Sequence, residues 1–237
     1  MLVGERVQVQ APHPAAAVKG IAEQLDGRVL EGVVAVGKNV LLSFEGGVVL
    51  RSHLRMRGRW HVHEGRREVG LGKPWLVLRS ATHEAVLWHG PILELDDRVR
   101  RRLGPDILAL PPAVDAMVAN LRALPDGMRL AEALQVQRAV AGIGNMWAAA
   151  ALWEVKLSPW LTLAETSDDE LRAALAAAAR LMHGRLRGLP GRRTAYRRAN
   201  RPCPRCGTLI RSWPLGDEAR MAYWCPGCQA GGTPPAQ

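Results

Sequence analysis

All four cysteines of the chain lie in one short segment near its C-terminus. Cys203 and Cys206 form one C-x2-C pair, and Cys225 and Cys228 form a second pair after 18 intervening residues. Two such pairs joined by a hairpin can surround one ion with four thiolates, a tetrahedral ligand set that Zn²⁺ favours. Two disulfide bonds are the alternative, but the two-residue spacing favours a metal knuckle over a strained local bridge. Four thiolates leave no position for water, so we expect a structural Zn²⁺.

The segment between the two cysteine pairs carries cations and aromatic rings, namely Arg211, Arg220, Tyr223 and Trp224. A metal-held hairpin of this composition suits nucleic acid, because cations meet phosphates and the hairpin tip can enter a groove. A solvated turn is the alternative interpretation.

The charge balance points to the same class of partner. The 237 residues include 32 Lys and Arg against 22 Asp and Glu, a formal charge of +10. Such an excess favours a polyanionic partner, because each neutralised phosphate releases counterions. No apolar run approaches the roughly 18 to 20 residues needed to cross a bilayer, and the N-terminus lacks a signal-peptide core. We therefore expect a cytoplasmic protein without a membrane partner.

The chain has two regions with different sequence patterns. Short runs of β-branched residues lie at 29–36, 40–44, 48–50, 75–78 and 85–88, and turn residues separate them. This pattern predicts an antiparallel sandwich or barrel. After Pro105, helical periodicity predicts helices at 114–124, 129–140, 145–155 and 168–187. The last helix opens on Ser167 and Glu170, which have the spacing of a capping box. The predicted fold is multidomain α+β, with domains at 1–103, 104–190 and 191–237.

A two-glycine turn lies between the second and third predicted helices. Gly142 and Gly144 precede Asn145, the first residue of the third helix. Glycines let the backbone approach a ligand closely, and a helix N-terminus presents unpaired N–H groups to it. Phosphate is the natural ligand, although such a turn can also be a simple connection.

Together these segments resemble the Fpg/Nei family of bifunctional DNA glycosylases, which excise oxidised bases and nick the resulting abasic site. Residues 141–145 look like the family's helix-two-turn-helix signature, residues 104–106 its linker, and residues 220–229 its zinc-finger hairpin. Tyr196, Arg198 and Pro202 fit the run into the finger.

The resemblance implies roles for four residues in DNA binding. Asn145 would grip the backbone near the lesion, and Lys38 and Arg220 would contact phosphates. Met56 would fill the space that a flipped base leaves, which an apolar, flexible side chain can do. Read without the resemblance, Met56 could be core filler and Lys38 a solvated charge. The implied partner is double-stranded DNA with a damaged base or abasic site, lying between the sandwich and the helical domain. The protein is expected to be a monomer associated with the nucleoid.

The start of the sequence departs from the family pattern. The family nucleophile is an N-terminal proline followed by glutamate, whereas this chain begins Met1-Leu2-Val3-Gly4-Glu5. Residues 2–4 resemble a helix end with its terminating glycine. We therefore expect the rest of the first helix, with its Pro-Glu, to be missing from this sequence, either because the start codon is misassigned and the helix lies upstream of Met1 or because the chain is truncated. No catalytic residue is identifiable in the sequence itself.

Two internal departures bear on catalysis. Val136 and Ala150 stand where the family usually has an aspartate and a glutamate. Lys38 could form a Schiff base instead, although phosphate contact is the favoured interpretation. His61 and His63 share a strand face and could suggest a metal, but no cysteine or carboxylate constellation accompanies them.

Three functional hypotheses remain open. The leading one is a base-excision repair protein of the DNA glycosylase and abasic-site (AP) lyase type. The alternatives are a catalytically silent damaged-DNA-binding module and a zinc-finger RNA binder.

Overall fold

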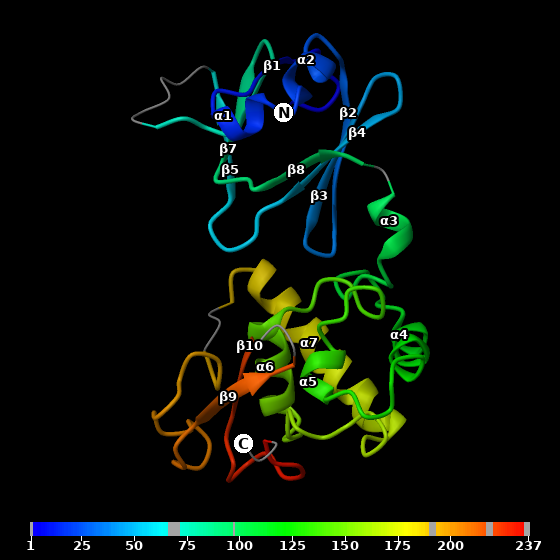
Figure 1. Cartoon of the computed structure of the whole chain (residues 1–237), viewed down its shortest axis with the longest axis vertical. Coiled ribbons are helices and arrows are strands. Elements are labelled where there is room, and N and C mark those ends of the chain that lie inside the picture. Colours follow the sequence, from blue (N-terminus) through cyan, green and yellow to red (C-terminus); the bar gives the residue numbers. More distant parts are fainter. Residues whose placement is uncertain (1, 66–71, 97, 190–192, 217–219, 235–237) are drawn as a thin grey trace. The chain divides into compact units, whose positions relative to one another are not determined.

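A computed structural model describes residues 2–65, 72–96, 98–189, 193–216 and 220–234. The chain forms two compact units, Met1–Arg102 and Leu103–Gln237 (Figure 1). The helical segment and the cysteine segment, which the sequence predicts to be separate domains, belong to the same unit. The predicted boundary between residues 190 and 191 lies outside the described residues.

The described residues of the first unit form two four-stranded antiparallel sheets and three short helices. One sheet has the order β1 (Gln8–Gln10), β6 (Leu76–Arg79), β7 (His83–Trp88) and β5 (Arg59–Glu64). The other has the order β2 (Leu30–Val36), β3 (Asn39–Phe44), β4 (Val48–His53) and β8 (Ile92–Leu95). The helices are α1 (Pro14–Ala17), α2 (Ile21–Leu25) and α3 (Val99–Arg102).

The two sheets of the first unit share one hydrophobic core. Phe44 and Leu50 from one sheet and Leu76 and Leu87 from the other are all fully buried in it. Leu25 of α2 joins the same cluster. A common core between two antiparallel sheets is the arrangement of a β-sandwich, so the predicted sandwich is confirmed.

Residues 2–4 form a turn rather than a helix. The Glu5 N–H donates to the Leu2 carbonyl at 3.1 Å, and Gly4 has a φ of +88°. Leu2 packs into the sandwich core, so this turn is an integral part of the first unit.

The second unit combines helices with a hairpin. Its elements are α4 (Val114–Arg122), α5 (Leu130–Ala133), α6 (Asn145–Glu154), α7 (Asp168–Leu186), β9 (Arg211–Leu215) and β10 (Arg220–Trp224). Leu215 and Trp224 of the hairpin belong to the same buried cluster as Leu152 of α6 and Leu175 of α7. None of the described helices has the length and apolar character needed to span a bilayer.

The helix predicted at 129–140 is wrong in its second half. Helix α5 ends at Ala133, and residues 134–140 form turns. The carbonyl of Gln137 accepts from the Gly104 N–H at 2.9 Å, and the carbonyl of Ala141 accepts from the Ile107 N–H at 3.0 Å. These contacts join the segment to the residues that enter the unit. The Gln135 carbonyl, which a helix through Val140 would pair with the Ala139 N–H, accepts instead from the Gln137 side-chain amide at 2.8 Å. Helical periodicity continues through these residues, but the tertiary pairing overrides it.

The predicted capping box of α7 is confirmed. The Ser167 hydroxyl accepts from the Glu170 N–H at 3.3 Å, and the Glu170 carboxylate accepts from the Ser167 N–H at 2.7 Å. Both N–H groups would otherwise lack helical partners. The box therefore fixes the start of the longest helix, which packs along α6 and α4 (Figure 1).

Replacing this cap should weaken the second unit measurably. We expect Ser167→Ala to lower the free energy of unfolding by about 1 kcal/mol, because the Glu170 N–H loses its acceptor. Glu170→Gln is the matched control, since a glutamine can still complete the box. Denaturant unfolding of both variants tests this. An equal loss in the two variants would contradict the role of the serine.

Candidate functional site

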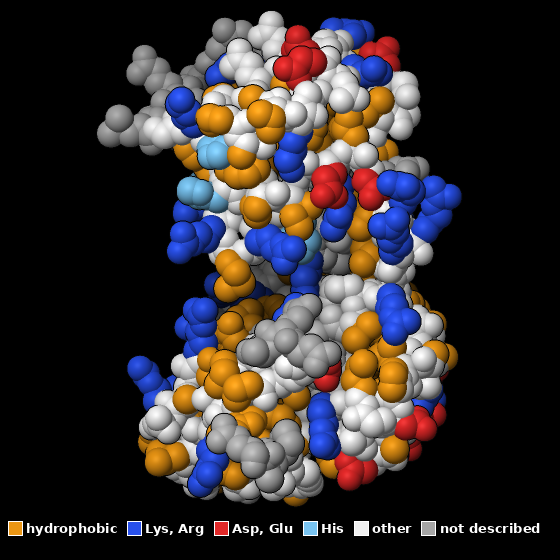
Figure 2. Space-filling model, viewed as in Figure 1, with side chains coloured by type: hydrophobic (Ala, Val, Ile, Leu, Met, Phe, Trp, Pro, Cys, Tyr) orange, Lys and Arg blue, Asp and Glu red, His pale blue; other side chains and the backbone are white. Residues whose placement is uncertain are grey.

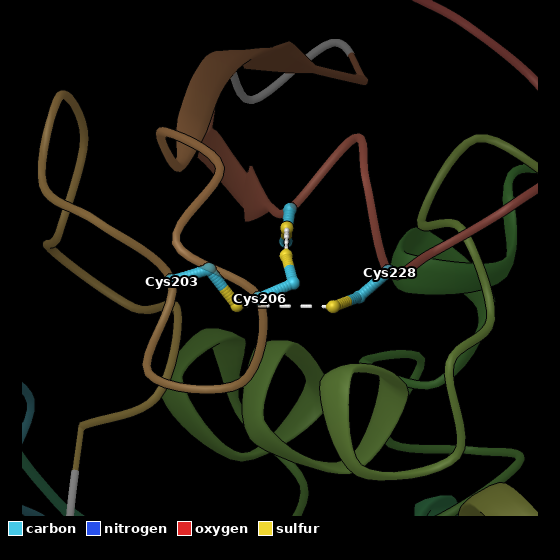
Figure 3. Close-up of side chains that lie close together, drawn as sticks. Cys203, Cys206 and Cys228 are labelled. Atoms are coloured by element: carbon cyan, nitrogen blue, oxygen red, sulfur yellow. Dashed lines mark hydrogen bonds between the residues drawn. The ribbon is translucent and has the colours of Figure 1, made fainter.

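The four cysteines converge in the second unit, as their spacing predicts. Their sulfur atoms all lie within 4.8 Å of one another. Cys203 and Cys228 Sγ are 3.9 Å apart, and Cys206 and Cys225 Sγ are 3.5 Å apart. These distances far exceed the roughly 2.05 Å of a disulfide bond, and all four are free thiols. Figure 3 shows Cys203 and Cys206 on the loop before β9 and Cys228 after β10, with their sulfurs turned toward a common point.

The thiols differ in how readily they give up their protons. The hydrogen bond from Thr208, followed by that from Cys228, lowers the pKa of Cys206 to about 6. Burial raises the pKa of the Cys225 thiol to about 12. A metal ion entering the cluster must therefore displace protons, so its binding is coupled to pH.

The cysteine loops are fastened to the C-terminal end of α6. The indole Nε1–H of Trp153 donates to Cys203 Sγ at 3.3 Å. The Arg205 guanidinium lies 3.8 Å from the centre of the Trp153 ring and donates to the Trp153 carbonyl at 2.8 Å. The Gln229 amide donates to the Leu157 carbonyl at 2.8 Å. Hydrogen bonds therefore join the cysteine loops to the C-terminal end of α6.

Asn145 and Arg220, both predicted to contact DNA, come together at the other end of α6. The Asn145 amide donates to the carbonyl of Met221, the residue after Arg220, at 2.9 Å. The Arg220 guanidinium donates to Gln135 Oε1 at 3.2 Å. Asn145 keeps a second amide N–H, and Arg220 is exposed. One site of the second unit therefore holds both residues.

The N-terminus of α6 can receive an anion. Its N-cap is Gly144, which supplies no capping side chain. Within the described part of the chain, no group accepts from the backbone N–H of Asn145 or Met146. Unpaired N–H groups at the positive end of a helix dipole bind anions such as phosphate.

Gln137 holds the glycine turn in shape. Its amide donates to the Ile143 carbonyl at 2.9 Å, and its Oε1 accepts from the Gly142 N–H at 3.0 Å. Gly142 has a φ of +103°, which a side chain would disfavour. Val136, which precedes Gln137, packs against the helical core, and Ala150 is half-buried on α6. Neither side chain can transfer a proton.

Lys38 and Met56 lie at one end of the sandwich in the first unit. Lys38 follows Gly37 in the turn between β2 and β3, and the next residue, Asn39, pairs with His53 at the end of β4. Met56 lies three residues beyond His53, and its side chain is 80% exposed. Core filling is therefore not its role.

The turn that carries Met56 has a specific conformation. The Gly58 N–H donates to the Leu54 carbonyl at 2.8 Å, and a Cβ on Gly58 would lie 2.5 Å from that oxygen. Arg55 has a φ of +50°, and its N–H donates to His53 Nδ1 at 3.0 Å. Burial lowers the pKa of His53, and the neighbouring cations, Arg55 first, lower it further. A neutral His53 can accept this bond, so the histidine helps to fix the turn.

Basic side chains extend beyond these predicted residues. Figure 2 shows Lys and Arg side chains gathered over α3, whose sequence contributes Arg100, Arg101 and Arg102. His61 and His63 do share one face of β5, with ring centres 6.1 Å apart. They belong to no group of three possible metal ligands among the described residues.

The comparisons with known proteins match these features. The family profile for the formamidopyrimidine-DNA glycosylase N-terminal domain matches residues 2–99. A probable endonuclease 8 2 of Streptomyces coelicolor is 37% identical over 229 residues, which cover 89% of this chain and 82% of that protein. This chain belongs to the Fpg/Nei family.

Further members of the family extend the similarity. The DNA-(apurinic or apyrimidinic site) lyase Nei2 of Mycolicibacterium smegmatis is 35% identical over 221 residues, covering 86% of this chain and 84% of that protein. A Lactococcus lactis formamidopyrimidine-DNA glycosylase, solved with DNA containing an abasic site, matches with a TM-score of 0.78. That match covers 97% of this chain and 94% of the other at 19% identity, and it shows the fold.

Several residues of the site escape sequence reasoning. Four residues connect the predicted site residues to one another, namely Gln135, Gln137, Trp153 and Arg205. Each does so through a contact with a distant segment or through a backbone carbonyl. The only signal in the sequence was position. The two glutamines flank Val136, and Trp153 lies in the last turn of the helix that Asn145 opens.

The cysteine cluster should bind one divalent ion per chain. Titration with Co²⁺ should give thiolate-to-metal charge-transfer bands that saturate at one equivalent, and Cys206→Ser should weaken them. Affinity should rise with pH, because the ion must displace protons such as that of Cys225. All four thiols should react with a thiol reagent only after chelation. Thiols that react equally with and without metal would contradict the site.

Proposed function

We propose that this chain is a base-excision repair protein of the DNA glycosylase and AP lyase type, acting on duplex DNA with a damaged base or abasic site. Its relatives are named for this chemistry, an apurinic or apyrimidinic site lyase among them. The local geometry of both units is consistent with binding to a phosphate backbone. The observation that carries the proposal is the meeting of Asn145, Arg220 and the open N-terminus of α6.

In this proposal each residue has a physical task. The α6 N–H groups and the second Asn145 amide hydrogen would bind phosphate oxygens, and Arg220 would add a charge-assisted bond. In the first unit, Lys38 would supply a point charge for a phosphate. Met56 would enter the stack where the damaged base leaves it, because its side chain already projects into solvent. Residues 141–145 would act as the family's helix-two-turn-helix element.

We infer further that the ion in the cysteine cluster is Zn²⁺ with a structural role. Four thiolates match the soft, tetrahedral preference of Zn²⁺, and they leave no open position for substrate. The ion would hold the β9–β10 hairpin against α6. It would take no part in bond breaking.

Base removal would require an amine nucleophile and a carboxylate. A Pro-Glu encoded ahead of Met1 would supply both. The proline amine would attack the sugar C1′ while the glycosidic bond to the base breaks and the base leaves with a proton. A second candidate function, a catalytically silent damaged-DNA-binding module, is favoured by Val136 and Ala150. These internal residues replace the aspartate and glutamate that the family resemblance leads us to expect, and neither side chain can transfer a proton.

Binding should depend on the residues at the N-terminus of α6. We expect Asn145→Ala and Arg220→Ala each to weaken affinity for an abasic-site duplex by about 1 to 3 kcal/mol. Arg220→Ala should also reduce the slope of log affinity against log salt by about one, since one phosphate contact is lost. Fluorescence anisotropy at several salt concentrations measures both quantities.

Arg172→Ala provides the control for these variants. Arg172 is exposed on α7 and pairs with Asp115 and Asp169, so its loss should change the affinity for DNA little. If all three variants bind the duplex equally well, the proposed phosphate site is wrong. A preference for structured RNA over the abasic duplex would favour the RNA-binding alternative.

Covalent trapping separates the enzyme from the silent binder. An AP lyase forms a Schiff base with the abasic sugar, and borohydride reduces this to a stable amine linkage. We expect a trapped complex from the chain that carries an upstream Pro-Glu, and none once that proline is removed. A trap that survives removal of the proline but is lost in Lys38→Arg would assign the chemistry to Lys38. Tight binding without any trapped product would establish the silent module.

A further inference from the structure

We infer that metal binding by the cysteine cluster positions Asn145 for DNA through helix α6, with Trp153 and Arg205 as the residues that couple the two sites. The inference rests on the proposed function, since it concerns how the phosphate site of that proposal is held in place. It adds a thermodynamic consequence: the metal and the DNA should raise each other's affinity.

The metal end of this connection consists of direct bonds to the last turn of α6. Trp153 reaches a ligand sulfur itself through its indole N–H, at 3.3 Å from Cys203. Arg205 lies between the cysteines of the first pair and donates to the carbonyls of Trp153 and Glu154, at 2.8 and 3.3 Å. Both carbonyls lie in the last turn of the helix, where the Trp153 carbonyl also accepts from the Lys156 N–H at 3.3 Å. Arg205 therefore adds a C-terminal cap to this turn.

The DNA end of the connection is also bonded to the cysteine segment. Asn145 donates to Met221 on β10, four residues before Cys225. Arg220 on the same strand donates to Gln135. Gln135 lies two residues before Gln137, the residue that holds the glycine turn in shape. The hairpin therefore contacts the N-terminal residue of α6 directly. It reaches the glycine turn indirectly, because the Gln135 carbonyl accepts from the Gln137 amide at 2.8 Å.

A helix can transmit this constraint because it is stiff along its axis. Helix α6 has 10 residues, Asn145–Glu154, which span about 15 Å at a rise of about 1.5 Å per residue. Its Ala148, Ala151 and Leu152 are fully buried in the core of the unit. Without metal, no ion joins the two loops that carry the cysteine pairs. The contacts of these loops with both ends of α6 are then held less firmly in place. Asn145 would then sample positions in which its amide and the helix N–H groups do not face one phosphate.

Linkage makes this inference measurable. If the ion increases DNA affinity by some factor, the DNA must increase metal affinity by the same factor. We would measure the Zn²⁺ dissociation constant with a competing chelator, with and without saturating tetrahydrofuran-site duplex. We expect a ratio of about tenfold for the wild-type chain, within the usual range of coupling between sites. The double variant W153F/R205A should lower the ratio to less than about threefold.

Arg180→Ala is the matched control. Arg180 pairs with Glu154 at 2.8 Å, at the same end of α6, but it contacts neither cysteine loop in the bonds described above. This variant should keep the wild-type ratio. Circular dichroism and metal-protected thiols would show that each variant is folded and loaded.

A second readout needs no DNA. In the Co²⁺-loaded chain, Trp153→Phe should shift the sulfur-to-metal charge-transfer band, because a hydrogen bond to Cys203 stabilises charge on that sulfur. Arg180→Ala should leave the band in place.

The outcomes separate the inference from the proposed function. If the wild-type chain does not bind the duplex at all, the proposed function fails and the coupling fails with it. If the duplex binds but the ratio is one, or is equal in the wild type and W153F/R205A, the inference alone is overturned. A loss of coupling in Arg180→Ala as large as in the double variant would also overturn it, since the effect would then not depend on the cysteine loops.

Discussion

The second unit depends on the attachment of the cysteine segment to both ends of helix α6. The segment has a very small core of its own, formed by Ala195, Cys203, Ile210 and Cys225. So few buried side chains cannot stabilise a hairpin alone, and small modules of this kind use a metal or a neighbouring domain for support. Here the hairpin buries Leu215 and Trp224 against the helices, and its four cysteines could hold a metal ion. The proposed phosphate site at Asn145 and Arg220 would depend on that packing.

The two units offer different kinds of contact to a nucleic acid. The second unit offers directional donors, namely helix N–H groups, an amide and a guanidinium. The first unit offers an exposed apolar side chain on a tight turn, fixed by Gly58 and His53 beside a lysine. Donors fix register on a backbone, whereas an apolar wedge responds to a gap in the base stack. In the proposed function, recognition of damage and binding of the backbone would therefore belong to separate parts of the chain.

Sequence patterns predicted the features that depend on local chemistry. The cysteine cluster, the capping box at Ser167 and the strands of the sandwich follow from spacing and periodicity over a few residues. The end of α5 does not follow from local periodicity, because residues 137 and 141 pair with Gly104 and Ile107, more than thirty residues earlier in the chain. The roles of Gln137, Trp153 and Arg205 were missed for the same reason. Their partners are chosen by the packing of distant segments, which no local pattern encodes.

The central claim is that duplex DNA contacts the α6 N-terminus, the hairpin strand that carries Arg220 and the turn that carries Met56. Hydrogen–deuterium exchange of the Zn²⁺-loaded chain, with and without an abasic-site duplex, tests this most directly. We expect DNA to protect peptides that cover residues 53–58, 142–147 and 220–224, and an intact duplex to protect the first of these less. Protection confined to other surfaces, with these three segments exchanging as in the free protein, would contradict the account.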